Sequence, residues 1–97
     1  MRFDFDPNKD RLNLEKHGLS LSLAQRLDWE AALLWIDDRQ GYGEKRVLAL
    51  APGTGILYYI AFVDRADVRR IISLRRANRR EVKRYVQALE EADDSDA

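Results

Sequence analysis

The sequence contains no cysteine and only one histidine, His17, among its 97 residues. Without cysteine the chain can form no disulfide, thiolate nucleophile, zinc finger or iron–sulfur cluster. One histidine also excludes a multi-histidine metal site, so we expect neither a metal nor another cofactor. No apolar run approaches the ~20 residues that a membrane-spanning helix needs. The opening residues lack a signal-peptide core, so we expect a cytoplasmic protein without membrane contact.

The length and composition indicate one small globular domain. Hydrophobic residues make up 45% of the chain and charged residues 35%, so a modest core is surrounded by a densely charged surface. We find no repeat and no linker. We therefore expect a single domain over residues 1–92, followed by a short acidic tail over residues 93–97 that is frayed.

The net charge of zero conceals a strong separation of charge along the chain. Residues 65–84 hold nine basic and two acidic groups, giving +7, whereas residues 85–97 hold five acids and no base. A block this basic creates a strong local positive potential, and nucleic acid is the commonest partner of such a surface. The separation favours a polyanion or an acidic protein as partner over a merely solvated surface.

Hydrophobic periodicity and turn residues predict an α+β domain. Asp6, Pro7 and Gly18 are typical of an N-cap, a first helical residue and a helix end. Asn78 and Glu81 have the spacing of a capping box at the start of the last helix. In chain order we expect a strand at 2–5, helices at 7–17 and 20–27, strands at 30–36, 45–51, 56–63 and 68–75, and a final helix from residue 78. The strands would form a small antiparallel sheet, flanked by two N-terminal helices and one C-terminal helix.

Simple alternation makes specific predictions about the strand faces. It places Arg70 with Ile72 and Leu74 on one face of the last strand, and Arg75 on the other. The strand at 56–63 is apolar almost throughout, which predicts a central strand covered on both faces.

The chemistry available to the chain is that of a clustered set of arginines, one histidine and several tyrosines. No phosphate-binding loop, metal constellation or nucleophile triad is recognisable. A metal-free ribonuclease needs a group that activates the ribose 2′-hydroxyl, cations that offset phosphate charge and a donor for the leaving oxygen. The inventory fits such an enzyme, and it fits equally a non-catalytic module that binds nucleic acid or protein.

Each candidate side chain also has a structural explanation. His17 precedes a helix-ending glycine, where a cation interacts favourably with the helix dipole. Tyr85 lies on the apolar face of the last helix and can serve as a core residue. Arg46, Arg70 and Arg75 are stronger candidates, because a charge on a strand of a small sheet needs a partner or an open face. Diffuse surface charge explains the remaining arginines, which are Arg69, Arg79, Arg80 and Arg84.

Four segments resemble the BrnT toxins of bacterial type II toxin–antitoxin systems. They are Phe5-Asp6 with Asn8-Lys9, Asn13 and Lys16-His17-Gly18; Arg39 with Tyr42-Gly43-Glu44 and Arg46; the strand Ile56–Val63 with Asp64-Arg65; and Arg70 to Asn78 with Glu81 and Tyr85. Phe5 stands where the family commonly has tryptophan, and Arg76 where lysine is frequent.

The resemblance implies a RelE-like fold and a metal-independent endoribonuclease that cleaves mRNA and arrests growth. It also implies a cognate BrnA-type antitoxin with a ribbon-helix-helix domain, through which alone the toxin would reach operator DNA. On this view Arg46, Arg70 and Arg75 bind the scissile phosphate, while His17, Glu81 or Tyr85 handles protons. Further contacts to RNA would come from Lys16, Arg76, Arg79 and Arg80.

Overall fold

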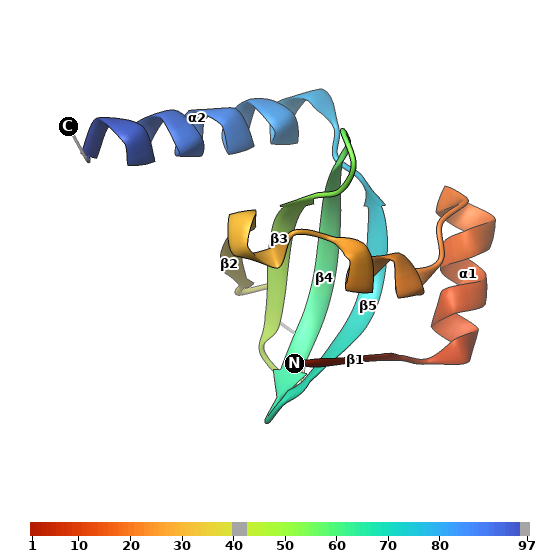
Figure 1. Ribbon diagram of the computed structural model, residues 1–97. Helices are drawn as coiled ribbons and strands as arrows, with labels where there is room; N and C mark the ends of the chain where they lie inside the picture. The colour runs from red at the N-terminus through yellow and green to blue at the C-terminus, as the bar shows by residue number, and fades with distance from the viewer. Residues whose placement is uncertain (40–42, 96–97) are drawn as a thin grey trace.

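The computed structural model describes residues 1–39 and 43–95 and has an α+β architecture (Figure 1). In chain order the elements are β1 (Arg2–Phe5), α1 (Pro7–His17), the 3₁₀ helices η1 (Leu21–Arg26) and η2 (Trp29–Ala31), β2 (Leu33–Asp37), β3 (Arg46–Pro52), β4 (Leu57–Arg65), β5 (Val68–Arg76) and α2 (Arg79–Ser95). Helix α2 thus extends into the segment expected as a tail, as far as Ser95, and residues 96–97 lie outside the described part of the chain.

The five strands form one mixed sheet in the order β1-β5-β4-β3-β2. Strands β2 to β5 form an antiparallel meander as expected, but β1 pairs with β5 in parallel, so the prediction of a purely antiparallel sheet is wrong. The segment from α1 to η2 carries the chain from β1 at one edge to β2 at the other (Figure 1). The meander then returns with β5 running in the direction of β1. The alternation of Phe3 and Phe5 predicts a strand with one apolar face. It does not predict whether that strand runs parallel or antiparallel to its neighbour.

The hydrophobic core lies between the sheet and the η1–η2 segment, on the side that we call the core face. Side chains of Ile60 and Phe62 from β4 pack there against Leu21, Ala24 and Leu27. The second expected helix is present, but as 3₁₀ turns rather than an α-helix. Ser20 caps its first turn by accepting a hydrogen bond from the Ser22 N–H at 3.2 Å.

A β-bulge in β5 changes the expected distribution of side chains. Ser73 pairs with Ala61 while Ile71 pairs with Phe62, so Ile72 is an extra residue without a partner on β4. Simple alternation fails at this point. Because Arg70 pairs with Val63 and Arg75 with Tyr59, both arginines lie on the same face, which we call the open face. The prediction that they lie on opposite faces is therefore wrong.

The open face of β4 is also less covered than the apolar sequence of this strand predicts. Tyr59 and Val63 are only half-buried there, whereas Tyr58, Ile60 and Phe62 on the core face are buried. The expected cover on both faces of β4 is therefore incomplete, and the open face is accessible to a ligand.

Asn13 joins α1 to the edge of β5. Its side-chain Nδ2 donates to the Leu74 carbonyl at 2.8 Å and to the Leu19 carbonyl at 2.9 Å, and its Oδ1 accepts from the Leu74 N–H at 3.1 Å. The register of β1 ends opposite Ile71, so the Asn13 amide satisfies backbone groups of β5 beyond that point. The Asn13 side chain thus fixes α1, and with it His17, beside the open face.

Substitution of Asn13 by alanine should lower the free energy of unfolding by about 2–3 kcal/mol, because it leaves a buried N–H and C=O of Leu74 without partners. The measurement is urea denaturation followed by circular dichroism. Asn8→Ala is the matched control on α1, since Asn8 is exposed, and it should change stability by less than about 0.5 kcal/mol. Equal effects of the two substitutions would contradict the role of Asn13.

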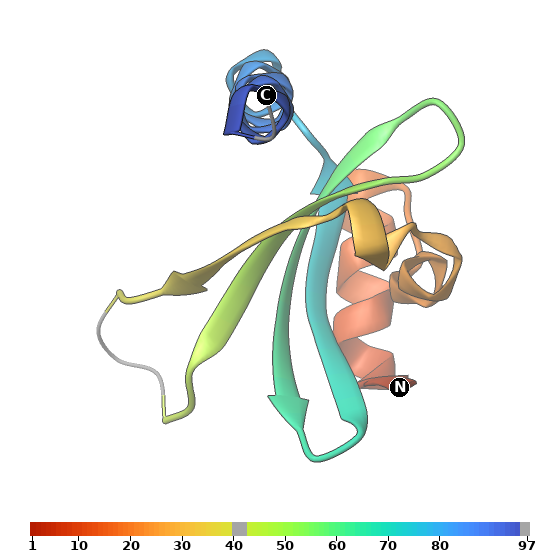
Figure 2. The same cartoon turned by 60° about the vertical axis from the view of Figure 1, so that its left-hand side comes forward.

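Helix α2 extends away from the end of β5, and its backbone lies apart from the sheet, which it contacts through side chains (Figures 1 and 2). Its predicted capping box is confirmed: the Glu81 N–H donates to Asn78 Oδ1, and the Asn78 N–H donates to Glu81 Oε1, each at 2.8 Å. Among the described residues, no helix is long and apolar enough to cross a membrane.

Candidate functional site

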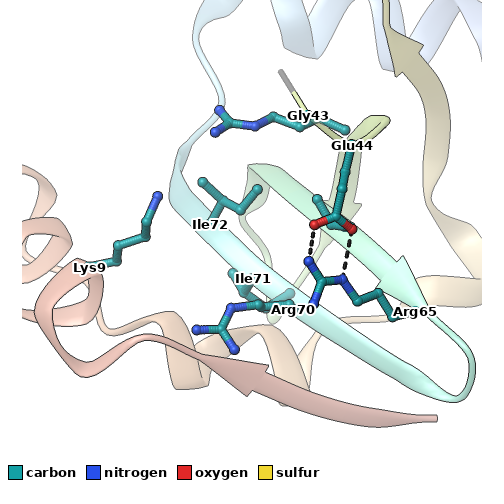
Figure 3. Close-up of a pocket in the computed structure, with 9 residues that line it drawn as sticks. Lys9, Gly43, Glu44, Arg65, Arg70, Ile71 and Ile72 are labelled. Atoms are coloured by element: carbon teal, nitrogen blue, oxygen red, sulfur yellow. Dashed lines mark hydrogen bonds and ion pairs between the residues drawn. The ribbon is translucent and has the colours of Figure 1, made fainter. Parts of the chain in front are cut away.

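A cationic hollow lies on the open face between α1 and the strands (Figure 3). Its volume is about 310 Å³, and its walls include Val63, Ile71, Ile72 and Gly43. The charged side chains around it are Lys9, Glu44, Arg46, Arg65 and Arg70. Four cations, one each from α1, β3, β4 and β5, therefore meet around one space, which we call the arginine hollow.

Two of these cations are held by acidic partners. Arg65 forms a forked ion pair with Glu44, and Arg70 Nη1 lies 2.8 Å from Asp4 Oδ2 on the neighbouring strand β1. The Arg70 and Asp4 side chains are about half exposed, so the pair orients Arg70 without removing it from solvent. Such exposed pairs are weak and can exchange for a phosphate. Lys9 reaches toward the hollow from α1 (Figure 3), and no acidic side chain in the described part of the chain pairs with it.

Arg46 enters the hollow from β3, beside the carboxylate of Asp37. The two residues are paired across β2 and β3. Asp37 is buried and accepts a forked hydrogen bond from Arg39 at 2.8 and 2.6 Å. This bond is the main reason that the pKa of Asp37 is lowered, and the charge of Arg46 lowers it further. Asp37 therefore stays ionised and holds the Arg39 side chain at the end of β2.

A second hollow of about 190 Å³ adjoins the first, with Lys9 and Ile72 lining both. We call it the histidine hollow, because His17, Lys16 and Ser73 also line it. His17 is half-buried at the end of α1. Burial lowers the pKa of His17, and the nearby charges of Lys16 and Arg75 lower it further. The imidazole is therefore mainly neutral at pH 7 and can accept a proton.

Arg75 lies on the same face but is firmly held. Its guanidinium donates two hydrogen bonds to Glu81, at 2.8 and 2.9 Å, and stacks 4.2 Å from the ring centre of Tyr59. The hydrogen bond to Glu81 raises the pKa of Arg75, and the same bond lowers the pKa of Glu81. Glu81 is thus an ionised anchor that positions Arg75 and caps α2.

The Glu81 carboxylate should make stability depend on acid pH. Because the pKa of Glu81 in the folded chain is lowered from its ordinary value of 4.5, its contribution is present above that pH and is lost as the pH falls below it. Between pH 6 and pH 3 the wild-type chain should therefore lose more unfolding free energy than Glu81→Gln, whose amide retains the capping geometry. Urea titrations at both pH values test this. Parallel losses in the two proteins would contradict the anchoring role.

Tyr59 is a site residue that sequence reasoning missed. Its ring lies between Arg75 and Trp35, with the Trp35 ring centre 6.1 Å away. Burial raises the pKa of the Tyr59 phenol, so this group remains protonated at neutral pH and can donate a hydrogen bond. Tyr59 lies on a strand that is apolar almost throughout, and the sequence alone does not indicate that Arg75 and Trp35 are its neighbours. That information comes only from the pairing of the strands.

Tyr85 lies apart from the two hollows. Its hydroxyl donates to the Ala31 carbonyl at 2.6 Å, and burial raises its pKa, with the charge of Asp28 as a second cause. The neighbouring Arg84 stacks 4.3 Å from the Trp35 ring centre. These contacts fasten the first half of α2 to the domain. The structure therefore does not bring Tyr85 together with His17, Arg46 and Arg70.

Four of the nine basic side chains in residues 65–84 form ion pairs with acidic side chains of the same chain. Arg69 was expected at the surface, but its side chain is only 13% exposed, pairs with Asp64 at 2.8 Å and stacks on Trp29 and Phe62. It is a structural residue. No acidic side chain of the described chain pairs with the following cations: Lys9, Lys16, Arg76, Arg79, Arg80 and Lys83. The last three line an open hollow with Asn78 at the start of α2.

Within residues 1–39 and 43–95, no group of three His, Asp or Glu side chains is placed to hold a metal ion.

Tyr42, which belongs to one of the segments that resemble the BrnT toxins, lies outside the described residues.

Comparison with known families identifies a match over most of the chain. A family model described as "Ribonuclease toxin, BrnT, of type II toxin-antitoxin system" matches residues 5–81. This range begins at Phe5, the last residue of β1, includes α1, β2 to β5 and both hollows, and ends at Glu81. No curated protein matches the chain.

Proposed function

The chain belongs to the BrnT family of ribonuclease toxins of type II toxin–antitoxin systems, and from this membership we propose that it cleaves mRNA on the open face of its sheet. The observation that carries the proposal is the meeting of Lys9, Arg46 and Arg70 around one hollow beside a half-buried histidine. A phosphate is the common ligand of forked guanidinium donors and lysine. A RelE-like relationship of the fold is part of the same proposal.

The proposed roles follow from the chemistry of each hollow. Arg46 and Arg70 bind the scissile phosphate and stabilise the charge that develops on it, with Lys9 as an additional cation. Neutral His17 accepts the proton of the ribose 2′-hydroxyl, which attacks the adjacent phosphorus. The bond from phosphorus to the 5′-oxygen then breaks, and that oxygen takes a proton from a nearby donor.

Arg75 and Tyr59 support these groups. Burial and the charge of Lys16 lower the pKa of His17, the charge of Arg75 lowers it further, and Glu81 fixes Arg75 in place. The protonated Tyr59 phenol is one donor on this face. We assign no proton transfer to Glu81 or Tyr85, because Glu81 is engaged by Arg75 and Tyr85 by Ala31. Lys16, Arg76, Arg79 and Arg80 contribute attraction for RNA along both sides of the site.

The proposed antitoxin is of the BrnA type and neutralises the chain by covering the two hollows. Such a partner would offer acidic side chains to the cations that lack one, and would exclude RNA from the same surface. The free chain should bind RNA with strong salt dependence, whereas the antitoxin complex should bind it poorly at the same salt. Filter binding with labelled RNA at several salt concentrations tests this. An unchanged affinity and salt slope at saturating antitoxin would show separate sites.

Cleavage of RNA by the purified chain tests the enzymatic proposal and its independence of metal. Because RNA supplies its own nucleophile, we expect cleavage in EDTA, with products that carry a 2′,3′-cyclic or 3′-phosphate and a 5′-hydroxyl. The measurement is end-group analysis of an unstructured RNA, which removes any effect of magnesium on RNA folding. Activity that disappears in EDTA and returns with magnesium would overturn the metal-independent mechanism. Binding without cleavage would favour the alternative, a non-catalytic binding module.

A further inference from the structure

Helix α2 carries an apolar stripe that nothing in the described part of the chain covers. Val82, Val86 and Leu89 are 41%, 45% and 49% exposed, and their spacing places them along one side of the helix. The opposite side faces the domain, where Arg84 stacks on Trp35 and Glu91 lines a shallow hollow with Leu33. Tyr85, which bonds to Ala31, lies between the domain-facing side and the stripe, and the stripe itself remains exposed.

The charges of α2 are distributed in the opposite way to those that stabilise an isolated helix. Its first half carries Arg79, Arg80, Lys83 and Arg84, and its second half carries Glu90, Glu91 and Asp93. Cations at the N-terminal end and acids at the C-terminal end both interact unfavourably with the helix dipole. Lys83 also has no acid three or four residues away on its C-terminal side, so the halves cannot pair within one helix.

We propose that the stripe binds a second copy of this chain, with the two α2 helices antiparallel. In that arrangement the basic half of each helix lies along the acidic half of the other, and the stripes cover one another. A parallel pair would instead place like charges together. This assembly is independent of the proposed ribonuclease activity and concerns a surface outside both hollows.

The positions of the charged residues agree with a twofold axis near Val86. Lys83 and Glu90 are seven residues apart, so they occupy the same side of the helix, directly beside the stripe. Arg79 and Asp93 lie one heptad before and one heptad after Val86, so they continue the stripe at its two ends. The pairs Lys83–Glu90, Arg79–Asp93 and Val82–Leu89 all have midpoints within one residue of Val86. A single twofold axis therefore brings the two apolar stripes together, and each of the two ion pairs forms twice in the dimer.

The length of α2 indicates how strong the association should be. A helix of 17 residues is about 25 Å long, so an antiparallel pair is at the small end of specific interfaces. We therefore expect a reversible dimer that dissociates on dilution. A projecting helix of this length is only marginally stable alone, so dimerisation should also raise its helicity.

Sedimentation equilibrium of the full chain, from micromolar to near-millimolar concentration, tests the proposal. The wild type should show a monomer–dimer equilibrium, and Val86→Glu should weaken it at least about tenfold. Val86 is exposed, so the variant should fold, which circular dichroism verifies. A wild type that remains monomeric throughout overturns the proposal. If that monomer loses antitoxin binding through Val86→Glu, the stripe belongs to the antitoxin instead.

Charge reversal tests the antiparallel arrangement separately. Lys83→Glu or Glu90→Lys should each weaken the dimer about fivefold or more, because each change makes two attractive pairs repulsive. Mixing these two variants should restore association, and so should the double variant. Glu91→Lys is the matched control, since Glu91 faces the domain, and it should change the dissociation constant less than about twofold. Equal effects of Glu90→Lys and Glu91→Lys, or no recovery on mixing, would overturn the antiparallel dimer.

Discussion

Replacement of either Arg46 or Arg70 by alanine should lower the single-turnover rate of RNA cleavage by at least about 100-fold, because each removes a fixed cation from the arginine hollow. The rate should fall even at saturating RNA, since the lost interaction acts on charge that develops during the reaction. Arg70 is exposed and Arg46 is partly exposed, so the variants should remain folded.

Arg80→Ala provides the matched control for these variants. Arg80 is exposed near the start of α2 and has no acidic partner in the described chain, so its charge contributes mainly diffuse attraction. This change should weaken RNA binding, reduce the salt slope by about one and alter the saturated rate less than about threefold. Similar losses of saturated rate in Arg46→Ala, Arg70→Ala and Arg80→Ala would mean that total charge, not the hollow, determines activity.

His17→Gln should lower the cleavage rate by about 100-fold or more and remove its dependence on acid pH. His17 acts in its neutral form, and its pKa lies below the ordinary value of 6.5. The wild-type rate should therefore be constant above pH 7 and should fall as the pH drops through the lowered pKa. The measurement is the single-turnover rate between pH 5 and pH 8.

The substitution Lys16→Met tests the role of His17 in a second way. The charge of Lys16 contributes to the lowered pKa of His17, so its removal should raise that pKa and move the fall in rate to higher pH. A merely structural role of His17 at the end of α1 would leave the position of this fall unchanged. A profile that is the same in the wild type, Lys16→Met and His17→Gln would exclude His17 as the base.

Local features of the fold were predictable because they depend on neighbouring residues. The cap at Asp6, the helix end at Gly18 and the capping box of Asn78 and Glu81 are all found where the sequence indicated them. Each depends on hydrogen bonds or backbone angles within a few residues. The strand positions of β3, β4 and β5 were also close to prediction, since apolar periodicity specifies them.

Features that depend on distant parts of the chain were not predictable in the same way. The bulge at Ile72 moves Arg70 and Arg75 to one face, and nothing in the local sequence announces it. Asn13 bonds to Leu74, which is 61 residues away, and so brings His17 beside β5.

The roles of individual site residues depend on the same long-range pairing. Arg69 was classed with the surface arginines because its partners, Trp29 and Phe62, come from other elements. Tyr59 was overlooked for the same reason. The sequence therefore identified the chemical groups of the candidate site, whereas the sheet register determines which of them meet.

The most direct test of the central proposal is to locate bound RNA on the protein. An RNA with a 2′-deoxy nucleotide at the cleaved position lacks the nucleophile, so it should bind without being cut. In an NMR titration of the labelled chain with this RNA, we expect the largest amide shifts at Arg46, at residues 70–73 of β5 and at Lys9 to His17. Shifts confined to α2, or cleavage of the deoxy-substituted RNA at that position, would contradict an RNA-cleaving site on the open face.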